Sequence, residues 1–193
     1  MHNKTNLIKK IILVGLLTIS PLLALEEANI KSEMESKTQN ITNVLQNSSL
    51  SSQQKKEQIA PVTDSIFDYK IMSKISLGQN WKQLTLEEQN NFSNKFEHKL
   101  KNSYFEKLEL YTNEKVVVNE LKKVKATRIH LHTDIVGSSE SYEIIYKFYK
   151  VKNSNDWLIY DIDITGVSII QTYRKQFTEF LATKSFNELL DSL

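Results

Sequence analysis

Residues 157–177 constrain the fold most, because they combine a strand, a turn and a helix in one run. Apolar and acidic residues alternate with a period of two in the first half, which predicts a strand with one buried face that carries Leu158, Tyr160, Ile162 and Ile164. Gly166 then permits a tight turn. Beyond it, apolar side chains recur at helical spacing. The stretch therefore predicts a helix folded back against its own sheet.

Upstream of residue 114 the apolar residues follow helical spacing instead. We predict helices over about 26–47 and 52–63, the second ending or kinking at Pro61, and a third through residues 66–77 with Gly78 as its cap. Thr85 and Glu88 match a capping box that opens a long helix. Its apolar stripe contains Phe92, Phe96, Leu100, Tyr104, Leu108 and Tyr111.

From Glu114 onward the period changes to two. We predict four strands, over 116–124, 126–136, 142–151 and 157–165, joined by short turns. Short connections require antiparallel pairing. The sequence therefore predicts an α+β fold, in which an antiparallel four-stranded meander packs against N-terminal and C-terminal helices.

The first 25 residues have the pattern of a signal peptide rather than of a folded domain. Lys4, Lys9 and Lys10 precede an apolar run that ends in Leu25, and Ala24 is a suitable small residue for cleavage. The run is shorter than the roughly 20 residues of a membrane-spanning helix. An uncleaved N-terminal anchor is the alternative. We expect residues 26–193 to form a single domain in the periplasm.

Composition excludes several classes of protein. The chain has no cysteine, so it has no disulfides, no thiol catalysis and no lipid-modified cysteine. Its 25 basic and 23 acidic residues become 22 and 23 once the three N-terminal lysines are removed, a net charge of about −1. That balance provides no basic surface of the kind that binds nucleic acid.

Two groups of polar residues are candidate functional sites. His130, His132 and Asp134 share one strand face and are metal-ligand types, although a solvated face is the simpler interpretation and no fourth ligand is evident. Asp161 and Asp163 have the form of an acid/base pair, but a wet face or a salt bridge with Arg174 explains them as well. We predict neither a metal site nor a catalytic residue.

No motif for nucleotide, cofactor or zinc-protease chemistry is present, so we expect no cofactor. The remaining feature is the large number of apolar residues in the predicted strands and helices. Periodicity alone fits a filled core as well as a sheet and helices that enclose an apolar ligand.

Several blocks in order resemble the MlaC, or toluene-tolerance, family. Phe67-Asp68-Tyr69, Ser76-Leu77-Gly78 and Trp81 resemble its FDF…LG..W signature, with Tyr69 in place of the second Phe. The stripe from Phe92 to Tyr111 is similar to its long helix. Residues 157–161, 166–168 and 173–177 resemble its W.vyDv..eGvS…yR.qF block. The likeness covers about residues 59–193. Asp68 and Arg174 match the pattern, and we expect both to be structural.

The resemblance implies a non-enzymatic, phospholipid-binding carrier that maintains outer-membrane lipid asymmetry. Such a carrier shuttles lipid between an outer-membrane lipoprotein–porin complex and an inner-membrane ABC transporter with an MCE-domain protein. It also implies an α+β fold resembling nuclear transport factor and cystatin-like sheets, with acyl chains in an apolar pocket between sheet and helices.

For the acyl chains we select residues by periodicity, each of which a filled core would also explain. They are Phe96, Leu100, Tyr104, Tyr146, Phe148, Tyr160, Ile162, Ile164, Val167, Ile170 and Tyr173. Two other functions stay open: an exported enzyme on a similar α+β fold that acts on a small apolar substrate, and a scaffold with a filled core. An enzyme needs an Asp or Tyr with a perturbed pKa inside the pocket, whereas a carrier needs a long pocket without ionisable groups at its base.

Overall fold

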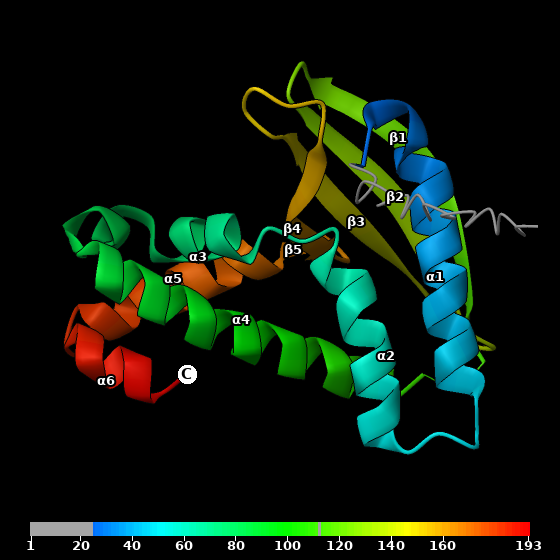
Figure 1. Cartoon of the computed structure of the whole chain (residues 1–193), viewed down its shortest axis with the longest axis horizontal. Helices are drawn as coiled ribbons and strands as arrows, with labels where there is room; N and C mark the ends of the chain where they lie inside the picture. Colours follow the sequence, from blue (N-terminus) through cyan, green and yellow to red (C-terminus); the bar gives the residue numbers. More distant parts are fainter. Residues whose placement is uncertain (1–24, 112) are drawn as a thin grey trace, which may run out of the picture.

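The computed structural model describes residues 25–111 and 113–193, and in these the predicted α+β order is confirmed (Figure 1). Helices come first, a meander of strands follows, and helices end the chain. The elements are η1 (Glu27–Asn29), α1 (Ile30–Gln46), α2 (Ser52–Asp64), α3 (Tyr69–Leu77), η2 (Gly78–Gln83), α4 (Leu86–Leu108), β1 (Lys115–Lys125), β2 (Arg128–Val136), β3 (Ser141–Lys150), β4 (Trp157–Ile164), β5 (Val167–Ser168), α5 (Ile169–Leu181) and α6 (Phe186–Asp191).

The helix ends follow their local chemistry. The predicted capping box opens α4, where the Thr85 hydroxyl accepts from the Glu88 backbone N–H at 3.2 Å and the Glu88 carboxylate accepts from the Thr85 N–H at 2.8 Å. Gly78 caps α3 with φ +58°, a conformation that glycine adopts without strain. α2 runs to Asp64, close to the predicted end, and continues three residues beyond Pro61, so Pro61 does not end it.

The sheet has five strands in the order β1-β2-β3-β4-β5, all antiparallel to their neighbours. The predicted four-stranded meander is therefore correct, with one short strand added. Thr165 and Gly166, both with positive φ, make the turn after β4, and Val167 pairs back onto Ile164. This turn sends the chain directly into α5, as the sequence indicates.

A bulge in β4 corrects the predicted faces of this strand. Lys147 pairs with Asp161 and Phe148 pairs with Ile159, so Tyr160 is left without a partner on β3. The extra residue inverts the alternation. Ile162 and Ile164 lie on one face, as predicted, whereas Leu158 lies on the other, because its partner is Tyr149.

The outer edge of β4 is covered by two distant segments. The Ile159 N–H donates to the Ile66 carbonyl at 2.8 Å and its carbonyl accepts from the Asp68 N–H at 2.9 Å. Further along, the Trp157 N–H donates to the Leu25 carbonyl at 2.8 Å. Together with β5, these contacts leave little of this edge free for unwanted strand pairing.

Leu25 therefore belongs to the folded part of the chain. Its side chain is only 6% exposed and packs beside Ile30 and Trp157. The predicted signal peptide, residues 1–25, stays a prediction. The rest of the predicted signal, residues 1–24, lies outside the described residues.

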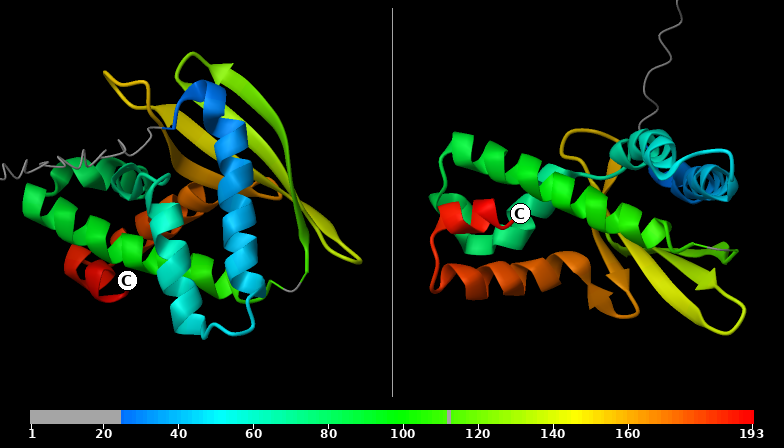
Figure 2. Two further views of the ribbon diagram at one scale, coloured as in Figure 1. Left: turned by 45° about the vertical axis from the view of Figure 1, so that its right-hand side comes forward. Right: turned by 90° about the horizontal axis from the view of Figure 1, so that it is seen from below.

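Two hydrophobic clusters share the interior. One joins α3, η2, α4, α5 and α6 around Phe92, Phe96 and Phe177, whose rings lie 5.4–5.7 Å apart. The other joins α1 to the sheet around Phe148, Trp157 and Ile159. Phe67 packs against both. Seen from below, α4 extends from the helical side towards the sheet (Figure 2). No helix in the described ranges is both long and apolar enough to cross a bilayer.

Candidate functional site

One face of the sheet, here the inner face, is apolar and turns towards α1. Register places Ile129, Leu131 and Thr133 of β2 on it, opposite Phe148, Tyr146 and Ile144 of β3. Through β3, Ile159, Ile162 and Ile164 of β4 join the same face. The opposite face, here the outer face, carries charged and polar side chains: His130, His132, Lys147, Asp161 and Asp163.

On β3 and β4, burial falls along the inner face, whereas β2 stays buried as far as Thr133. On β3, Phe148 is fully buried, Tyr146 and Ile144 are half-buried, and Tyr142 is 43% exposed. β4 repeats the trend from buried Ile159, through half-buried Ile162 and Ile164, to Val167 of β5, which is 55% exposed. The hydrophobic core thus covers only one end of this face. We name the other end the open end; it comprises Thr133, Ile135, Tyr142, Ile144, Tyr146, Ile162, Ile164 and Val167.

Tyr104 of α4 lies near Tyr146 of the open end. Burial raises its pKa well above the ordinary value, and the neighbouring phenols of Tyr146 and Tyr69 add to the shift. Burial likewise raises the pKa of Tyr146 to about 12, with a smaller contribution from Tyr142. Yet Tyr104 and Tyr146 both keep accessible surface. These phenols are therefore desolvated by surrounding protein while part of each side chain borders a space that admits water.

The structure brings five of the predicted lining residues together. Tyr146, Ile162 and Ile164 belong to the open end, Val167 lies at its rim, and Tyr104 of α4 is close enough to Tyr146 for that phenol to affect its pKa. They come from α4, β3, β4 and β5. They form one continuous apolar surface with two phenols on it.

The other predicted residues lie elsewhere. Phe96, Leu100 and Ile170 are buried in the helical cluster, with Tyr173 packed against it, and Phe148 is buried in the cluster beside α1. Tyr160 is on the outer face, where its ring lies 6.2 Å from that of Tyr149 and 5.2 Å from the Arg128 guanidinium. The β4 bulge is the reason, so Tyr160 is withdrawn from the lining.

Sequence reasoning missed several residues of the open end. Tyr142 and Ile144 share the period-two stripe of Tyr146 and Phe148, which is a signal that could have identified them. Thr133 alternates with Ile129 and Leu131 in the same way. His130 and His132 alternate with these residues and lie on the outer face, which is where the sequence predicted a candidate metal site.

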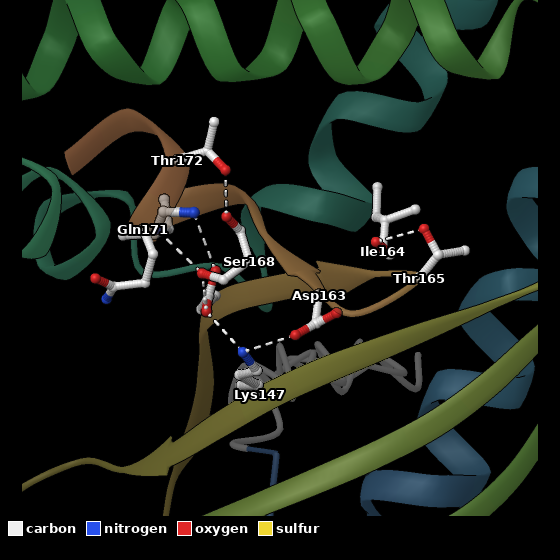
Figure 3. Close-up of polar contacts among 9 residues, drawn as sticks. Lys147, Asp163, Ile164, Thr165, Ser168, Gln171 and Thr172 are labelled. Carbon is white, nitrogen blue, oxygen red and sulfur yellow. Dashed lines mark hydrogen bonds and ion pairs between the residues drawn. The ribbon is translucent and has the colours of Figure 1, made fainter. Parts of the chain in front are cut away.

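On the outer face, Asp161 of β4 holds the start of α5 to the sheet, and Asp163 pairs with Lys147 of β3 (Figure 3). Asp161 is buried and accepts from the Ser168 hydroxyl at 2.7 Å, from the Ile170 N–H at 3.1 Å and from Lys147 Nζ at 3.1 Å. Asp163 lies 3.3 Å from the same Lys147 Nζ. These ion-pair contacts raise the pKa of Lys147 against the opposing effect of burial. The arrangement is structural.

The sequence suggested a salt bridge between these aspartates and Arg174. In the structure, Arg174 is not their partner. Its guanidinium lies against Gly78, where an added Cβ would be 3.0 Å from Nε. Asp68 is structural as expected, because it caps α3 through the Ile71 N–H at 2.9 Å and accepts from the Tyr149 hydroxyl.

The His130, His132 and Asp134 strand face has other partners. His132 Nδ1 lies 2.6 Å from Glu143 Oε1, and Asp134 accepts from the Asn119 amide at 2.8 Å. Burial, together with Lys147 and His132, lowers the pKa of His130. Across residues 25–111 and 113–193, no group of three or more His, Asp or Glu side chains is arranged to hold a metal ion.

Two hollows lie near the sheet. One of about 570 Å³ separates α1 from β1 and has mostly polar walls, among them Thr38, Thr42 and Gln46, but it also touches Val118. Val118 is the register partner of Thr133, so this hollow adjoins the open end. The second, of about 810 Å³, surrounds the turn after β3 and carries Arg128, Lys150 and Lys152. None of the predicted lining residues faces either hollow.

Comparison with known proteins agrees with this architecture. The family profile described as MlaC protein matches residues 35–193. None of the curated proteins compared with the chain matches it. Among solved structures, the chain is similar to the phospholipid-binding protein from Ralstonia solanacearum in complex with a phospholipid. That likeness has a TM-score of 0.72 at 19% identity, and covers 83% of this chain and 92% of the other. At this identity it shows a shared fold.

Proposed function

The chain belongs to the MlaC family, and from that premise we propose that it is a periplasmic carrier of phospholipid. The observation that carries the proposal is the graded burial of the inner face, whose apolar surface continues beyond the hydrophobic core to the open end. A chain that bound only proteins would have no need to leave a sheet interior half-covered. The solved relative, which holds a phospholipid, supports the same assignment.

The energetics fit a carrier. Each methylene removed from water contributes about 0.8 kcal/mol, so two acyl chains of some 15 methylenes would cost on the order of 20 kcal/mol in bare water. An apolar site between sheet and helices keeps the acyl chains out of water and so removes most of that free-energy cost. Transfer from a bilayer into the protein is then close to neutral. Such a site sets no direction by itself, because binding alone only shifts an equilibrium.

Direction must therefore come from partners. We propose an outer-membrane lipoprotein–porin complex at one side and an inner-membrane ABC transporter with an MCE-domain protein at the other. ATP hydrolysis at the transporter would supply the free energy, and this chain would be the substrate-binding component between the two membranes.

Chemistry at the open end favours a carrier over an enzyme. Its eight residues include no acid, histidine or lysine, and burial raises the pKa of Tyr146 to about 12, away from the range of a general acid or base at physiological pH. Asp161 and Asp163, the nearest candidates for acid/base chemistry, point to the outer face and are paired with Lys147. An isomerase or hydrolase would need such groups to contact the bound molecule.

The test is native mass spectrometry, with solvent extraction, of protein purified from the periplasm without detergent. We expect about one phospholipid per chain, recovered chemically intact after prolonged incubation. Recovery of lysophospholipid or free fatty acid would support a hydrolase instead. A folded, lipid-free protein that takes up no lipid from vesicles would refute the carrier.

A further inference from the structure

A buried hydroxyl on the inner face lacks a partner. Thr133 is 1% exposed, and its Oγ1 makes no hydrogen bond within the described residues. Buried polar groups in folded proteins are nearly always paired, because an unpaired one loses its bond to water without replacement. An orphaned hydroxyl at the open end therefore suggests that a partner is supplied from outside the chain.

Two phenols, unlike Thr133, are not fully buried, but they too make no hydrogen bond in the described part of the chain. Leu131 pairs with Tyr146 and Thr133 pairs with Ile144, so Thr133 and Tyr146 are diagonal neighbours on one face, within about 8 Å of each other. Tyr104 of α4 lies close enough to Tyr146 for that phenol to add to its raised pKa, and burial raises the pKa of both phenols. Neither hydroxyl makes a hydrogen bond among the described residues, whereas that of Tyr149 on the outer face donates to Asp68. Thr133 and Tyr146 thus carry unpaired hydroxyls on the same face of the sheet, and Tyr104 of α4 brings a third into their neighbourhood.

The depth of this group below the rim is informative. Thr133 lies two residues inward from Ile135, the partner of exposed Tyr142, which corresponds to about 7 Å along the strand. The hollow between α1 and β1 touches Val118, which pairs with Thr133. In a glycerophospholipid the ester groups lie a few bonds from the phosphate. A headgroup held in water at the rim would therefore place its esters at the depth of the hydroxyls.

We propose that the hydroxyls of Thr133, Tyr146 and Tyr104 form a polar subsite that donates hydrogen bonds to the ester carbonyl oxygens of a bound glycerophospholipid. This inference rests on the proposed function and deepens it. The subsite fixes how far the lipid enters, because the acyl chains beyond it meet only apolar side chains. It also makes the protein selective for ester-linked lipids over ether-linked lipids of the same size.

The experiment compares two lipids on one protein. Delipidated protein is titrated with a diacyl phosphatidylethanolamine and with the dialkyl ether analogue of equal chain length. The ether lipid has the same headgroup and chains but no carbonyl oxygens. We expect the ester lipid to bind about fivefold to twentyfold more tightly, the effect of one or two hydrogen bonds.

Variants then assign the effect to residues. Tyr146→Phe and Thr133→Val remove a hydroxyl with little change of shape, and each should weaken ester-lipid binding about fivefold while leaving ether-lipid binding unchanged. Tyr160→Phe on the outer face is the matched control and should alter neither.

The outcomes separate the two proposals. Equal binding of both lipids by the unmodified protein, which needs no variant to fold, would show that the hydroxyls contact only water and would overturn the subsite while the carrier stands. Binding of neither lipid would refute the carrier, and the subsite with it.

Discussion

Replacement of Asp161 by alanine should lower the free energy of unfolding by about 3–5 kcal/mol. The substitution leaves the N–H of fully buried Ile170 without an acceptor, which costs about 1–3 kcal/mol. It also removes the 2.7 Å hydrogen bond from Ser168 and one of the two carboxylates near Lys147. Loss of one partner from a buried ion pair is more damaging than loss of an exposed one, because a desolvated charge remains.

Asp163→Ala is the matched control, since Asp163 lies on the same strand and face and contacts the same lysine. Among the described residues its carboxylate pairs with Lys147, at 3.3 Å, and its Oδ1 is buried without a partner there, so its removal also removes an unsatisfied group. We expect a loss below about 1 kcal/mol. Urea denaturation monitored by circular dichroism measures both. Equal losses for the two variants, or a loss below 1 kcal/mol for Asp161→Ala, would refute the view that Asp161 joins α5 to the sheet.

Three further predictions concern the site and the chain's start. Ile164→Trp should fill the open end and lower co-purified phospholipid several-fold without unfolding the protein, whereas Tyr160→Trp on the outer face should not; equal occupancy in both would contradict our placement. Because the folded-state pKa of Tyr146 is raised to about 12, its contribution to stability is complete below pH 10 and is lost as the pH rises towards 12, by on the order of 2 kcal/mol. Tyr146→Phe should flatten that part of the stability–pH profile, and an unchanged profile would argue against a buried phenol. Finally, the intact mass of the exported protein should place its first residue at Leu25, and a chain that starts at Glu26 should be about 2 kcal/mol less stable because a buried leucine is missing. Identical melting curves would contradict this.

The arrangement of helices and strands could be predicted because each element has its own periodicity. The change of period at Glu114 separates helices from strands, and Thr85, Gly78 and Gly166 mark ends and turns through their own chemistry. These signals are local. They require no knowledge of what each element packs against.

The site could be predicted only in part, because periodicity gives the face of a residue but not what covers that face. Tyr146 and Phe148 lie on the same stripe, yet α1 and its neighbours bury Phe148 and leave Tyr146 half-covered. Leu100 and Tyr104 differ in the same way along α4, where the helical cluster ends between them. Tyr160 was misplaced for another reason, since a bulge is set by pairing with the neighbouring strand.

The central claim is that phospholipid lies between α4 and the open end of the inner face. Photo-crosslinking tests it most directly. p-Benzoylphenylalanine is placed at Ile164, and in a separate protein at Tyr160, and the protein is irradiated with its co-purified lipid before intact-mass analysis. We predict an adduct of phospholipid mass at Ile164 and none at Tyr160. An adduct at Tyr160, or none at Ile164 in protein that carries lipid, would contradict the account.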